Sequence, residues 1–400
     1  MRADNPAAIP RVLIDATAVP ADRGGVGRYV DNLIPALVRA GVELEVVCKP
    51  ADRDHVAALT GERPVIAPAS TRHVAYRLLW EQAGLPWLVK RSAADVVHAP
   101  HYTQPLAIRR PLVVTLHDAT FFTEAALHSS LKGPFFRAAT KLALRHAACC
   151  IVPSQATADE LVRVAGADPD RLHVAHHGVD HDLFAPPSVE QVTAARQRLG
   201  LPSDVSYVGF LGTLEPRKNV PALIRAWIRA CAHRAKPPAL VVAGGAGWDD
   251  AIDAATSEVP SGLTLLRPGF LPLEELPGFL GGATIVAYPS VAEGFGLPVL
   301  EAMACGTAVL TTRRLALPEV GGDAVAYTEP DEVSIARALT ELLDDPARRT
   351  ILAAAGVRRA ATFTWDRCAQ AHLRAYASAS ARGYRTWRRD GSSTEVRFRK

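Results

Sequence analysis

The stretch 283–310 constrains the fold more than any other part of this 400-residue chain. An apolar run, 284–288, is typical of a buried parallel strand and leads into a loop that contains two glycines. Pro298 then fits the first turn of a helix, where the missing N–H has no helical partner, and Gly306 is a plausible C-cap. A second apolar run, 308–311, begins the next strand. Strand, loop, helix and strand make one βαβ unit, which predicts an α/β fold.

Two carboxylates belong to this unit, and their placement indicates a ligand site. On a single helix, Glu293 and Glu301 would lie about 80° apart, so we place Glu293 in the loop and Glu301 in the first turn of the helix. Both then face the crevice at the carboxyl end of the sheet, where open α/β sheets bind ligands. The backbone N–H groups of the loop lie at the positive end of the helix and can hold a phosphate. The donor-binding residues expected here are Gly294, Phe295, Gly296, Leu297 and Glu301. The alternative is that both glutamates are solvated acids at a helix start.

The stretch resembles the Glu-x7-Glu motif of the retaining glycosyltransferases of family 4, which have the GT-B fold. The resemblance covers the first strand, Glu-Gly-Phe-Gly-Leu-Pro, the helix and the Gly-Thr-Ala-Val-Leu that follows it. It implies two Rossmann-like parallel-sheet domains that face a central cleft. It also implies that Glu293 contacts the transferred sugar and that Glu301 contacts the ribose of the donor nucleotide.

Length and composition agree with a chain of this kind. Four hundred residues suggest two or three domains, and 48% hydrophobic with 22% charged residues is normal for a soluble globular protein. No apolar run reaches 18 residues, and residues 1–10 lack the apolar core of a signal peptide. Six cysteines without Cys-x-x-Cys spacing argue against disulfides and zinc and suit a reducing cytoplasm. We therefore expect a cytoplasmic enzyme that binds no metal.

The positive charge is concentrated at the C-terminus. Residues 382–400 hold seven basic and two acidic residues, whereas the whole chain has a net charge of only +4. A nucleic-acid-binding protein more often spreads its basic residues over a folded face, so no nucleic acid is expected as a partner. The tail has few aliphatic residues, and we expect the segment beyond Gly383 to be mobile or loosely docked. It is either a solubilising tail or a contact with anionic lipid on the inner face of the membrane.

A second glycine loop follows the first predicted strand, 11–16. Gly24, Gly25 and Gly27 do not complete Gly-x-Gly-x-x-Gly, because Val30 stands where the last glycine would be needed. A Gly-Gly pair still allows a backbone to approach a ligand closely, although a plain turn before a helix is the alternative. Family 4 glycosyltransferases have a similar pair facing the donor diphosphate and the acceptor, and the resemblance carries this role to Gly25.

Histidines stand at the ends of two further predicted strands, 95–98 and 112–116. His98 and His101 have two interpretations, a satisfied side chain in the local structure or a site residue. Thr-Leu-His-Asp around His117 resembles the position of an active-site histidine near the transferred sugar in the family. Phe121 and Phe122 would then line the acceptor side. The predicted helix 131–147 carries Arg137, Lys141 and Arg145 on one face, which is either solvated or touches an anionic membrane.

The second predicted domain opens with the strand 207–211, which ends in Gly-Thr-Leu-Glu-Pro-Arg-Lys-Asn. Arg217 and Lys218 stand at a loop-to-helix junction, where phosphates bind well, and Arg supplies a bidentate fork beside the point charge of Lys. The alternative is two exposed basic residues. The segment resembles the diphosphate-binding segment of the family and its mannosyltransferase branch, although Thr213 replaces an arginine found in many members. The resemblance adds Gly212 and Phe270, the latter near the base.

The predicted domain boundaries follow from these strands and from composition. We expect an acceptor-side domain at 1–184, a Pro- and Ser-rich linker at 185–204 and a nucleotide-sugar-binding domain at 205–362. The resemblance implies a helix, 363–383, that crosses back to the first domain, with a basic tail at 384–400. His177 replaces the Asn of the family's Asn-Gly-Val-Asp at the end of the first domain, so no role is carried over to it.

The function expected from the resemblance is transfer of a hexose with retention of configuration and without a metal. The catalytic candidates are His117, Glu293, Arg217 and Lys218. The donor would be a nucleotide diphosphate sugar, GDP-mannose by resemblance, and the acceptor a glycan or a lipid-linked glycan; a UDP-sugar is the alternative donor. A catalytically silent nucleotide-sugar-binding protein is a second alternative. A metal-dependent GT-A transferase is a third, because Asp-x-Asp occurs at 52–54, 168–170 and 180–182.

Overall fold

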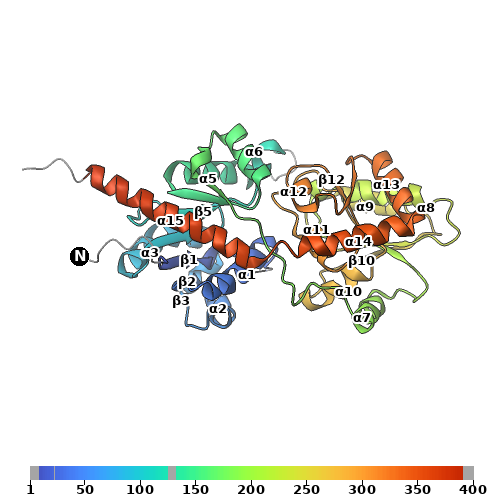
Figure 1. Cartoon of the computed structure of the whole chain (residues 1–400), viewed down its shortest axis with the longest axis horizontal. Coiled ribbons are helices and arrows are strands. Elements are labelled where there is room, and N and C mark those ends of the chain that lie inside the picture. Colours follow the sequence, from blue (N-terminus) through green and yellow to red (C-terminus); the bar gives the residue numbers. More distant parts are fainter. Residues whose placement is uncertain (1–8, 22, 125–131, 391–400) are drawn as a thin grey trace, which may run out of the picture. The chain divides into compact units, whose positions relative to one another are not determined.

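A computed structural model describes residues 9–21, 23–124 and 132–390 of the chain (Figure 1). The chain divides into two compact units. Unit 1 holds the described residues up to Thr123, those from 132 to His176 and those from Trp365 onward, and unit 2 holds Glu124 and His177–Thr364. Each unit is built around its own parallel sheet.

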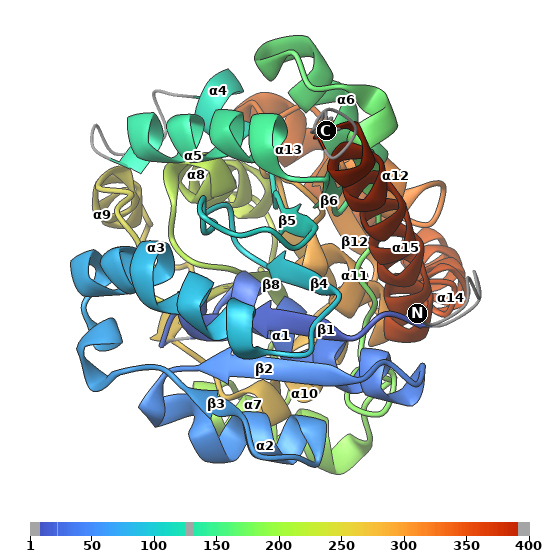
Figure 2. The ribbon, with the colours of Figure 1, turned by 90° about the vertical axis from the view of Figure 1, so that its left-hand side faces the viewer.

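The sheet of unit 1 has seven strands in the order β3-β2-β1-β4-β5-β6-β7, with all of its strand pairs parallel. Figure 2 shows the strands from β2 to β6 one above another. The order reverses between β1 and β4, as in dinucleotide-binding folds. The strands are β1 (Val12–Asp15), β2 (Leu44–Cys48), β3 (Val65–Ile66), β4 (Val96–Ala99), β5 (Leu112–Thr115), β6 (Cys149–Val152) and β7 (Leu172–Val174).

Helices cover both faces of this sheet because the short apolar strands are buried on both sides. Within β1, Val12 and Ile14 point to one core, and Leu13 points to the other. The first core is closed by α1 (Gly25–Arg39), α2 (Arg53–Thr60) and α15 (Trp365–Asp390). The second is closed by α3 (Val74–Arg91), α5 (Lys132–His146) and α6 (Gln155–Ala165). The short elements of the unit are η1 (Ala16–Ala18), η2 (Pro50–Asp52), η3 (Ala69–Arg72), α4 (Thr120–Thr123) and η5 (Pro169–Arg171).

A buried hydrogen-bond network ties α15 to the sheet of unit 1. The Tyr29 hydroxyl lies 2.9 Å from Thr115 Oγ1 and 2.7 Å from His372 Nε2. His98 Nε2 lies 2.8 Å from the same Thr115 oxygen, and its Nδ1 lies 2.9 Å from the Tyr376 hydroxyl. His98 and His372 are fully buried, so these partners replace the water that the rings lose on folding. The last helix is therefore part of the core of unit 1.

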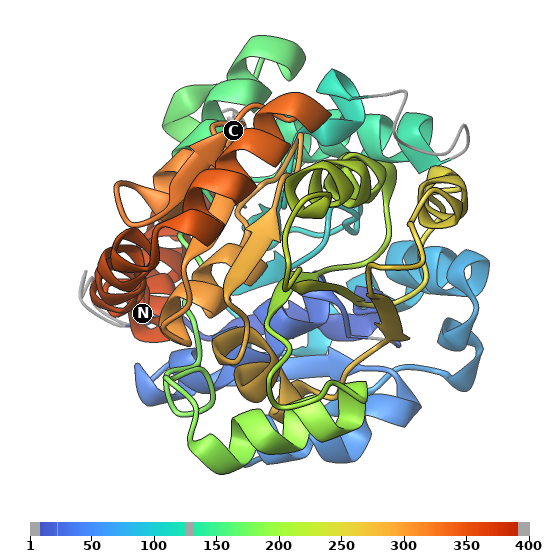
Figure 3. The same cartoon turned by 90° about the vertical axis from the view of Figure 1, so that its right-hand side faces the viewer.

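Unit 2 has a six-stranded parallel sheet in the order β10-β9-β8-β11-β12-β13, which is seen from its own side in Figure 3. The strand order reverses between β8 and β11. The strands are β8 (Tyr207–Leu211), β9 (Ala239–Ala243), β10 (Leu265–Gly269), β11 (Ile285–Tyr288), β12 (Val309–Thr312) and β13 (Ala326–Thr328). The predicted strands 207–211 and 239–243 match β8 and β9 in both bounds.

One continuous hydrophobic core joins the sheet and helices of unit 2. In it α8 packs against α9 and α13, while α11 packs against α10, α12 and α14. The helices are α8 (Val220–Cys231), α9 (Ala251–Ser257), α10 (Leu276–Gly281), α11 (Leu297–Ala304), α12 (Leu317–Gly321), α13 (Glu332–Asp344) and α14 (Pro346–Ala360), with η6 (Pro216–Lys218) and η7 (Leu273–Glu275) before α8 and α10. Within residues 9–21, 23–124 and 132–390, none of the helices combines the length and apolar character needed to cross a membrane.

Two expected segments differ from the observed elements. Most of the predicted linker is α7 (Val189–Leu199), which begins with a capping box formed by Ser188 and Gln191 and packs on α10 of unit 2. The packing is close, because a Cβ on Gly278 would lie 2.3 Å from the Gln191 carbonyl oxygen. The last helix continues to Asp390, past the expected end at 383. The remainder of the expected tail, 391–400, lies outside the described residues.

In the loop after β9, the backbone of Gly244 lies so close to the backbone of Gly212 in the loop after β8 that a side chain at position 244 would not fit. Gly244 has φ of +141°, and a Cβ there would lie 1.9 Å from the Gly212 carbonyl oxygen. The same two loops are joined by a hydrogen bond from Gly212 N to Ala243 O at 3.0 Å. No such limit applies to Gly245, where a Cβ would meet nothing within 4 Å.

Replacing Gly244 by Ala should therefore destabilise unit 2 by at least about 2 kcal/mol, because it adds both backbone strain and a steric overlap. Gly245→Ala is the matched control and should change the free energy of unfolding by less than about 0.5 kcal/mol. Urea unfolding of the two full-length variants measures the difference. Equal midpoints would show that the loops do not pack as described.

Candidate active site

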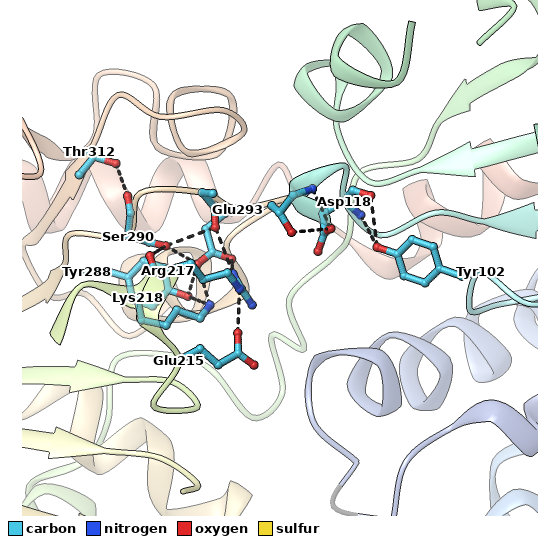
Figure 4. Close-up of polar contacts among 11 residues, drawn as sticks. Tyr102, Asp118, Glu215, Arg217, Lys218, Tyr288, Ser290, Glu293 and Thr312 are labelled. Atoms are coloured by element: carbon cyan, nitrogen blue, oxygen red, sulfur yellow. Dashed lines mark hydrogen bonds and ion pairs between the residues drawn. The ribbon is translucent and has the colours of Figure 1, made fainter. Parts of the chain in front are cut away.

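Two loops of unit 2 meet at the carboxyl edge of its sheet and form a compact charged cluster (Figure 4). The first loop follows β8 and contributes Glu215, Arg217 and Lys218. The second follows β11 and contributes Ser290 and Glu293. Because the strand order reverses between β8 and β11, this edge is the place where open α/β sheets form their ligand crevice.

Glu293 is the centre of the cluster. Its Oε2 accepts a hydrogen bond from Arg217 Nη1 at 2.6 Å, and its Oε1 accepts one from Lys218 Nζ at 2.6 Å. Oε1 also accepts hydrogen bonds from the Ser290 hydroxyl at 2.7 Å and the Tyr288 hydroxyl at 2.9 Å. Glu293 and Lys218 each expose only 6% of their surface, so this ion pair is buried. The structure thus excludes the interpretation of Glu293 as a solvated helix-start acid.

Further contacts hold the two cations in place. Arg217 Nε donates to Glu215 Oε2 at 2.7 Å, and Arg217 Nη1 donates to the Ala292 carbonyl at 3.1 Å. Lys218 Nζ also donates to the Tyr288 hydroxyl. The planar guanidinium therefore bridges a carboxylate on each loop, which a lysine could not do with the same geometry. The sequence interpretation of Arg217 and Lys218 as merely exposed basic residues does not hold.

Backbone contacts lock the loops together beneath these side chains. The Arg217 carbonyl accepts a hydrogen bond from Val291 N at 2.9 Å and lies 2.9 Å from the Ser290 hydroxyl oxygen, whose single proton it shares with Glu293 Oε1. On the other side, the Thr312 hydroxyl donates to the Ser290 carbonyl at 2.6 Å (Figure 4). The loop of Glu293 is thus supported both by the loop after β8 and by the end of β12.

The electrostatics of the cluster favour an ionised carboxylate. Burial alone would raise the pKa of Glu293, but Arg217 and Lys218 more than offset burial and lower this pKa to about 2. Burial and the charge of Arg217 lower the pKa of Lys218, whereas Glu293 opposes that shift. Burial, followed by the nearby charge of Glu293, raises the pKa of Tyr288 well above its usual value, so Tyr288 is a neutral donor.

Helix α11 begins directly after this loop, with Gly296 as its N-cap at φ +108°. This left-handed conformation favours glycine and turns the chain so that the start of the helix follows the Glu293 loop. The N-terminal end of α11 thus adds partial positive charge near the two cations. Glu301 was expected in the first turn, but the first turn contains no acid and Glu301 lies in the second. The shift arises because the helix begins at Leu297. Glu301 is only 3% exposed, so it is not a solvated acid.

The remaining donor-site candidates of unit 2 differ in their surroundings. The Phe295 side chain is buried with its ring 5.0 Å from that of His177, so only its backbone is a candidate for phosphate contact. Phe270 follows β10 and exposes 66% of its surface. Gly212 directly follows β8 and meets the loop after β9, whereas Gly294 lies between Glu293 and Phe295.

Unit 1 carries the other two candidates, Gly25 and His117. Gly25 is the first residue of α1, is exposed, and would have no atom within 4 Å of an added Cβ. His117 follows β5, and its Nε2 lies 2.7 Å from the Pro100 carbonyl oxygen. Because a carbonyl only accepts hydrogen bonds, the proton of the neutral ring resides on Nε2. Burial lowers the pKa of His117, which keeps the ring neutral.

The two other histidines of unit 1 have different surroundings. His98 lies in the buried network beneath α15, which supports the interpretation of a satisfied core residue. The His101 ring lies 5.7 Å from that of His117, and burial lowers its pKa to about 3. The Tyr102 hydroxyl lies 2.9 Å from Asp118 N, which braces the segment that carries His117 (Figure 4).

The basic residues on α5 are partly engaged within unit 1. Arg137 Nη1 donates to the Phe121 carbonyl at 2.9 Å, and Lys141 lies 6.0 Å from the centre of the Phe122 ring. Phe121 itself stacks on Phe136 with 4.6 Å between ring centres. Lys141 and Arg145 are exposed, whereas Arg137 is partly buried, so these three residues do not form a uniformly exposed basic stripe on α5.

The Asp-x-Asp segments occupy structural positions. Asp52 pairs with Arg23, with 3.0 Å between Oδ1 and Nη1. Asp168 caps η5 by accepting from Asp170 N, and Asp180 accepts from the backbone of Asp182 at 3.1 Å. These contacts explain the acids as turn and cap residues.

Sequence reasoning missed three residues of the cluster, Glu215, Tyr288 and Ser290. Glu215 stands within the segment 212–219 that drew attention to Arg217 and Lys218. Tyr288 ends β11, and Ser290 follows it in the loop that leads to Glu293. These residues could have been predicted as site residues, because they are polar and lie at the carboxyl end of a strand beside which the strand order reverses.

Comparison with known proteins gives matches over almost the whole described chain. Residues 23–183 match the model of Glycosyltransferase Family 4, and residues 191–359 match that of Glycosyl transferases group 1. O-antigen chain mannosyltransferase B of Escherichia coli is 30% identical over 307 residues, covering 76% of this chain and 79% of the relative. D-inositol 3-phosphate glycosyltransferase of Mycobacterium avium is 33% identical over 404 residues, covering 92% of each chain.

Solved structures are similar in fold at lower identity. The crystal structure of Anabaena Alr3699/HepE in complex with UDP and glucose has a TM-score of 0.70 and 22% identity, covering 90% of this chain and 97% of that one. The structure of WaaG, a glycosyltransferase involved in lipopolysaccharide biosynthesis, has a TM-score of 0.68 and 15% identity, covering 90% and 98%. These similarities agree with the two parallel sheets described above.

Replacing Glu293 by Gln should destabilise the chain at neutral pH by about 3–5 kcal/mol, because it leaves the buried ammonium of Lys218 without its carboxylate. The pKa of Glu293 is about 2 in the folded protein, against 4.5 ordinarily. Its stabilisation is therefore complete above pH 4.5 and is lost as the pH falls toward 2. The difference in urea midpoint between wild type and E293Q should shrink over that interval.

Glu258→Gln is the control for this experiment, because it breaks an exposed ion pair with Arg225. An exposed pair contributes little, so this variant should follow the wild type at every pH. A wild-type advantage over E293Q that stays constant down to pH 3 would contradict the buried ion pair.

Proposed function

The chain belongs to the family 4 glycosyltransferases of the GT-B fold, and from this membership we propose that it transfers mannose from GDP-mannose to a glycan or lipid-linked acceptor with retention of configuration. The observation that carries the proposal is the buried carboxylate of Glu293 held by the adjacent cations Arg217 and Lys218. This cluster lies at the switch point of the unit 2 sheet, directly before α11.

The chemical need of such a reaction is to stabilise a departing nucleoside diphosphate. Arg217, Lys218 and the N-terminal end of α11 concentrate positive charge at one place, where a diphosphate would gain charge in the transition state. The cluster is already ordered by Glu215, Ser290 and Tyr288, so little reorganisation is needed when the charge develops. We propose that these groups do the work of a metal, and that Glu301 binds the ribose.

The ion pairs of Glu293 suggest how donor binding prepares the site. A diphosphate that approaches Arg217 and Lys218 competes with Glu293 for the same N–H donors. Each contact that the phosphates take leaves more of the carboxylate available to the hydroxyl groups of the sugar. The two cations are paired with Glu293 before donor binding and with the phosphates after it, which avoids an unpaired cation in a buried site.

We assign the acceptor side to unit 1. The neutral ring of His117 has its Nε2 proton engaged by Pro100, so it acts by orienting a sugar and not as a cation. The exposed backbone at Gly25 leaves room for a close approach by substrate. No group is assigned as an enzymatic nucleophile, and attack by the acceptor hydroxyl on the face that the diphosphate leaves accounts for retention.

We propose GDP-mannose as the donor substrate. The E. coli relative is a mannosyltransferase, and the segment 212–219 resembles the mannosyltransferase branch, which supports GDP-mannose. A UDP-sugar is the second candidate, because the Anabaena structure was solved with UDP and glucose. We further propose a cytoplasmic enzyme, with Lys141, Arg145 and the basic C-terminal residues near anionic lipid.

The function is tested by incubating the full chain with labelled GDP-mannose, UDP-glucose and UDP-mannose, with and without EDTA. Saturating GDP-mannose at 100 times its dissociation constant should stabilise the protein by about 2.7 kcal/mol in a melting experiment. Turnover should persist in EDTA, and NMR should show an α-linked product from the α-linked donor. Binding without turnover on any glycan or lipid-linked acceptor would favour a silent sensor, and dependence on manganese would refute charge stabilisation by Arg217 and Lys218 alone.

Arg217→Ala and Lys218→Ala should each lower kcat/KM by roughly 10²–10³-fold, about 2.7–4 kcal/mol, as found when a donor to a developing negative charge is removed. Arg225→Ala, which removes a half-exposed arginine from α8, is the control and should retain wild-type kcat/KM. Normal rates in both site variants, measured at subsaturating donor, would remove these residues from the diphosphate site.

A further inference from the structure

Helix α3 of unit 1 reverses the usual arrangement of a surface helix, because it buries two charged residues and exposes large apolar ones. Its buried residues are Arg77, Glu81, Leu85 and Val89, spaced by four and turned toward the sheet. The opposite side carries three large apolar residues, Tyr76, Leu79 and Trp87, which expose 57%, 66% and 58% of their surfaces. Their spacings of three and eight place them on one stripe of the helix. A surface helix ordinarily has polar residues there.

One exposed apolar residue of a neighbouring loop lies beside α3. Leu106 is exposed, and its N–H donates to Gln82 Oε1 at 3.1 Å, which holds its loop against the helix. We call Tyr76, Leu79, Trp87 and Leu106 the α3 face. A contiguous apolar patch on a surface indicates a partner.

The charge around the α3 face identifies the kind of partner. Between Arg72 and Arg91 every exposed charged residue is basic, namely Arg72, Lys90 and Arg91, and the one acid, Glu81, is buried by its pair with Arg77. The Arg91 guanidinium lies 3.5 Å from the centre of the Trp87 ring, so cation and aromatic group form one unit. An apolar stripe rimmed by cations complements a surface that is apolar inside and anionic outside.

A second copy of the chain does not fit this pattern. A two-fold interface through the α3 face would place the same surface on both sides. Arg72 lies just before the helix, and Lys90 and Arg91 end it, so both the parallel and the antiparallel arrangement bring cations against cations. Repulsion of this kind disfavours an interface.

We infer that the α3 face binds the interface of an anionic lipid bilayer. Trp87 and Tyr76 are side chains with an apolar body and a polar tip that suit the headgroup level, and Leu79 enters the acyl boundary. Arg72, Lys90 and Arg91 meet lipid phosphates. Helix α5 packs on the same side of the sheet as α3, and it exposes Phe135, Lys141 and Arg145. The inference deepens the proposed lipid-linked acceptor by naming the surface that brings the enzyme to it.

The test is flotation of the full chain with vesicles of phosphatidylcholine alone or with phosphatidylglycerol, at low and high salt. The wild type should float with the anionic vesicles, and more weakly at high salt. The double substitution Leu79→Glu and Trp87→Glu should lower the vesicle partition coefficient by at least roughly tenfold, because each change removes apolar burial worth more than about 1.4 kcal/mol. The control is Val333→Glu with Ile351→Glu, which changes two residues of similar exposure in unit 2 and should leave flotation unchanged.

A labelled cysteine reports the depth of insertion. All six native cysteines are buried, so Leu79→Cys gives one reactive position for an environment-sensitive dye, and Ile351→Cys gives its control. The dye at position 79 should shift to the blue with anionic vesicles, whereas the dye at 351 should not.

Equal flotation of the wild type and the Leu79→Glu, Trp87→Glu variant would overturn the inference. So would a wild-type dimer that this variant converts to monomer without a loss of flotation, since the face would then join two copies. Transfer to a water-soluble acceptor analogue should be the same in both proteins. Absence of such transfer with the expected flotation would refute the proposed function and leave the membrane surface standing.

Discussion

A carboxylate buried between two cations determines how the loops of unit 2 are arranged. Glu293 satisfies both cations, while Ser290 and Tyr288 share one of its oxygens. Such a group could not be buried alone, because an unpaired charge in the interior costs several kcal/mol. The loop after β8 and the loop after β11 must therefore close on each other for either to be stable. The same closure assembles the charge that a nucleotide-sugar enzyme needs.

The parallel sheets explain why this assembly occurs where it does. Both units reverse their strand order beside their first strand, at β1 and β4 in unit 1 and at β8 and β11 in unit 2. Loops that leave neighbouring strands in opposite directions open a crevice between them. Glycines at these loops serve different needs. Gly25 leaves space, whereas Gly244 allows two backbones to touch.

The sequence was sufficient to predict the strands that are buried along their whole length. Strands β8 and β9 are buried on both sides, so an unbroken apolar run marks their bounds. Strand β3 has only two residues, too few for any periodic signal. Helix α3 was not recognised because Arg77 and Glu81 face inward while Tyr76 and Trp87 face outward, which inverts the usual pattern. At the site, motif residues could be named in advance, but the pairing of Glu293 with Arg217, 76 positions away, exists only in the folded chain.

The position of α15 has a consequence for the order in which the protein can be made. The core of unit 1 includes Trp365, Cys368, Tyr376 and Ala379, which follow all of unit 2 in the chain. A ribosome therefore releases His177–Thr364, which makes up nearly all of unit 2, before it releases the helix that completes unit 1. Domains ordinarily fold from the N-terminus as they emerge. Here the second unit can reach its native core first, and the first must wait, with β5, β6 and β7 uncovered on the face that α15 contacts, until the last helix leaves the exit tunnel.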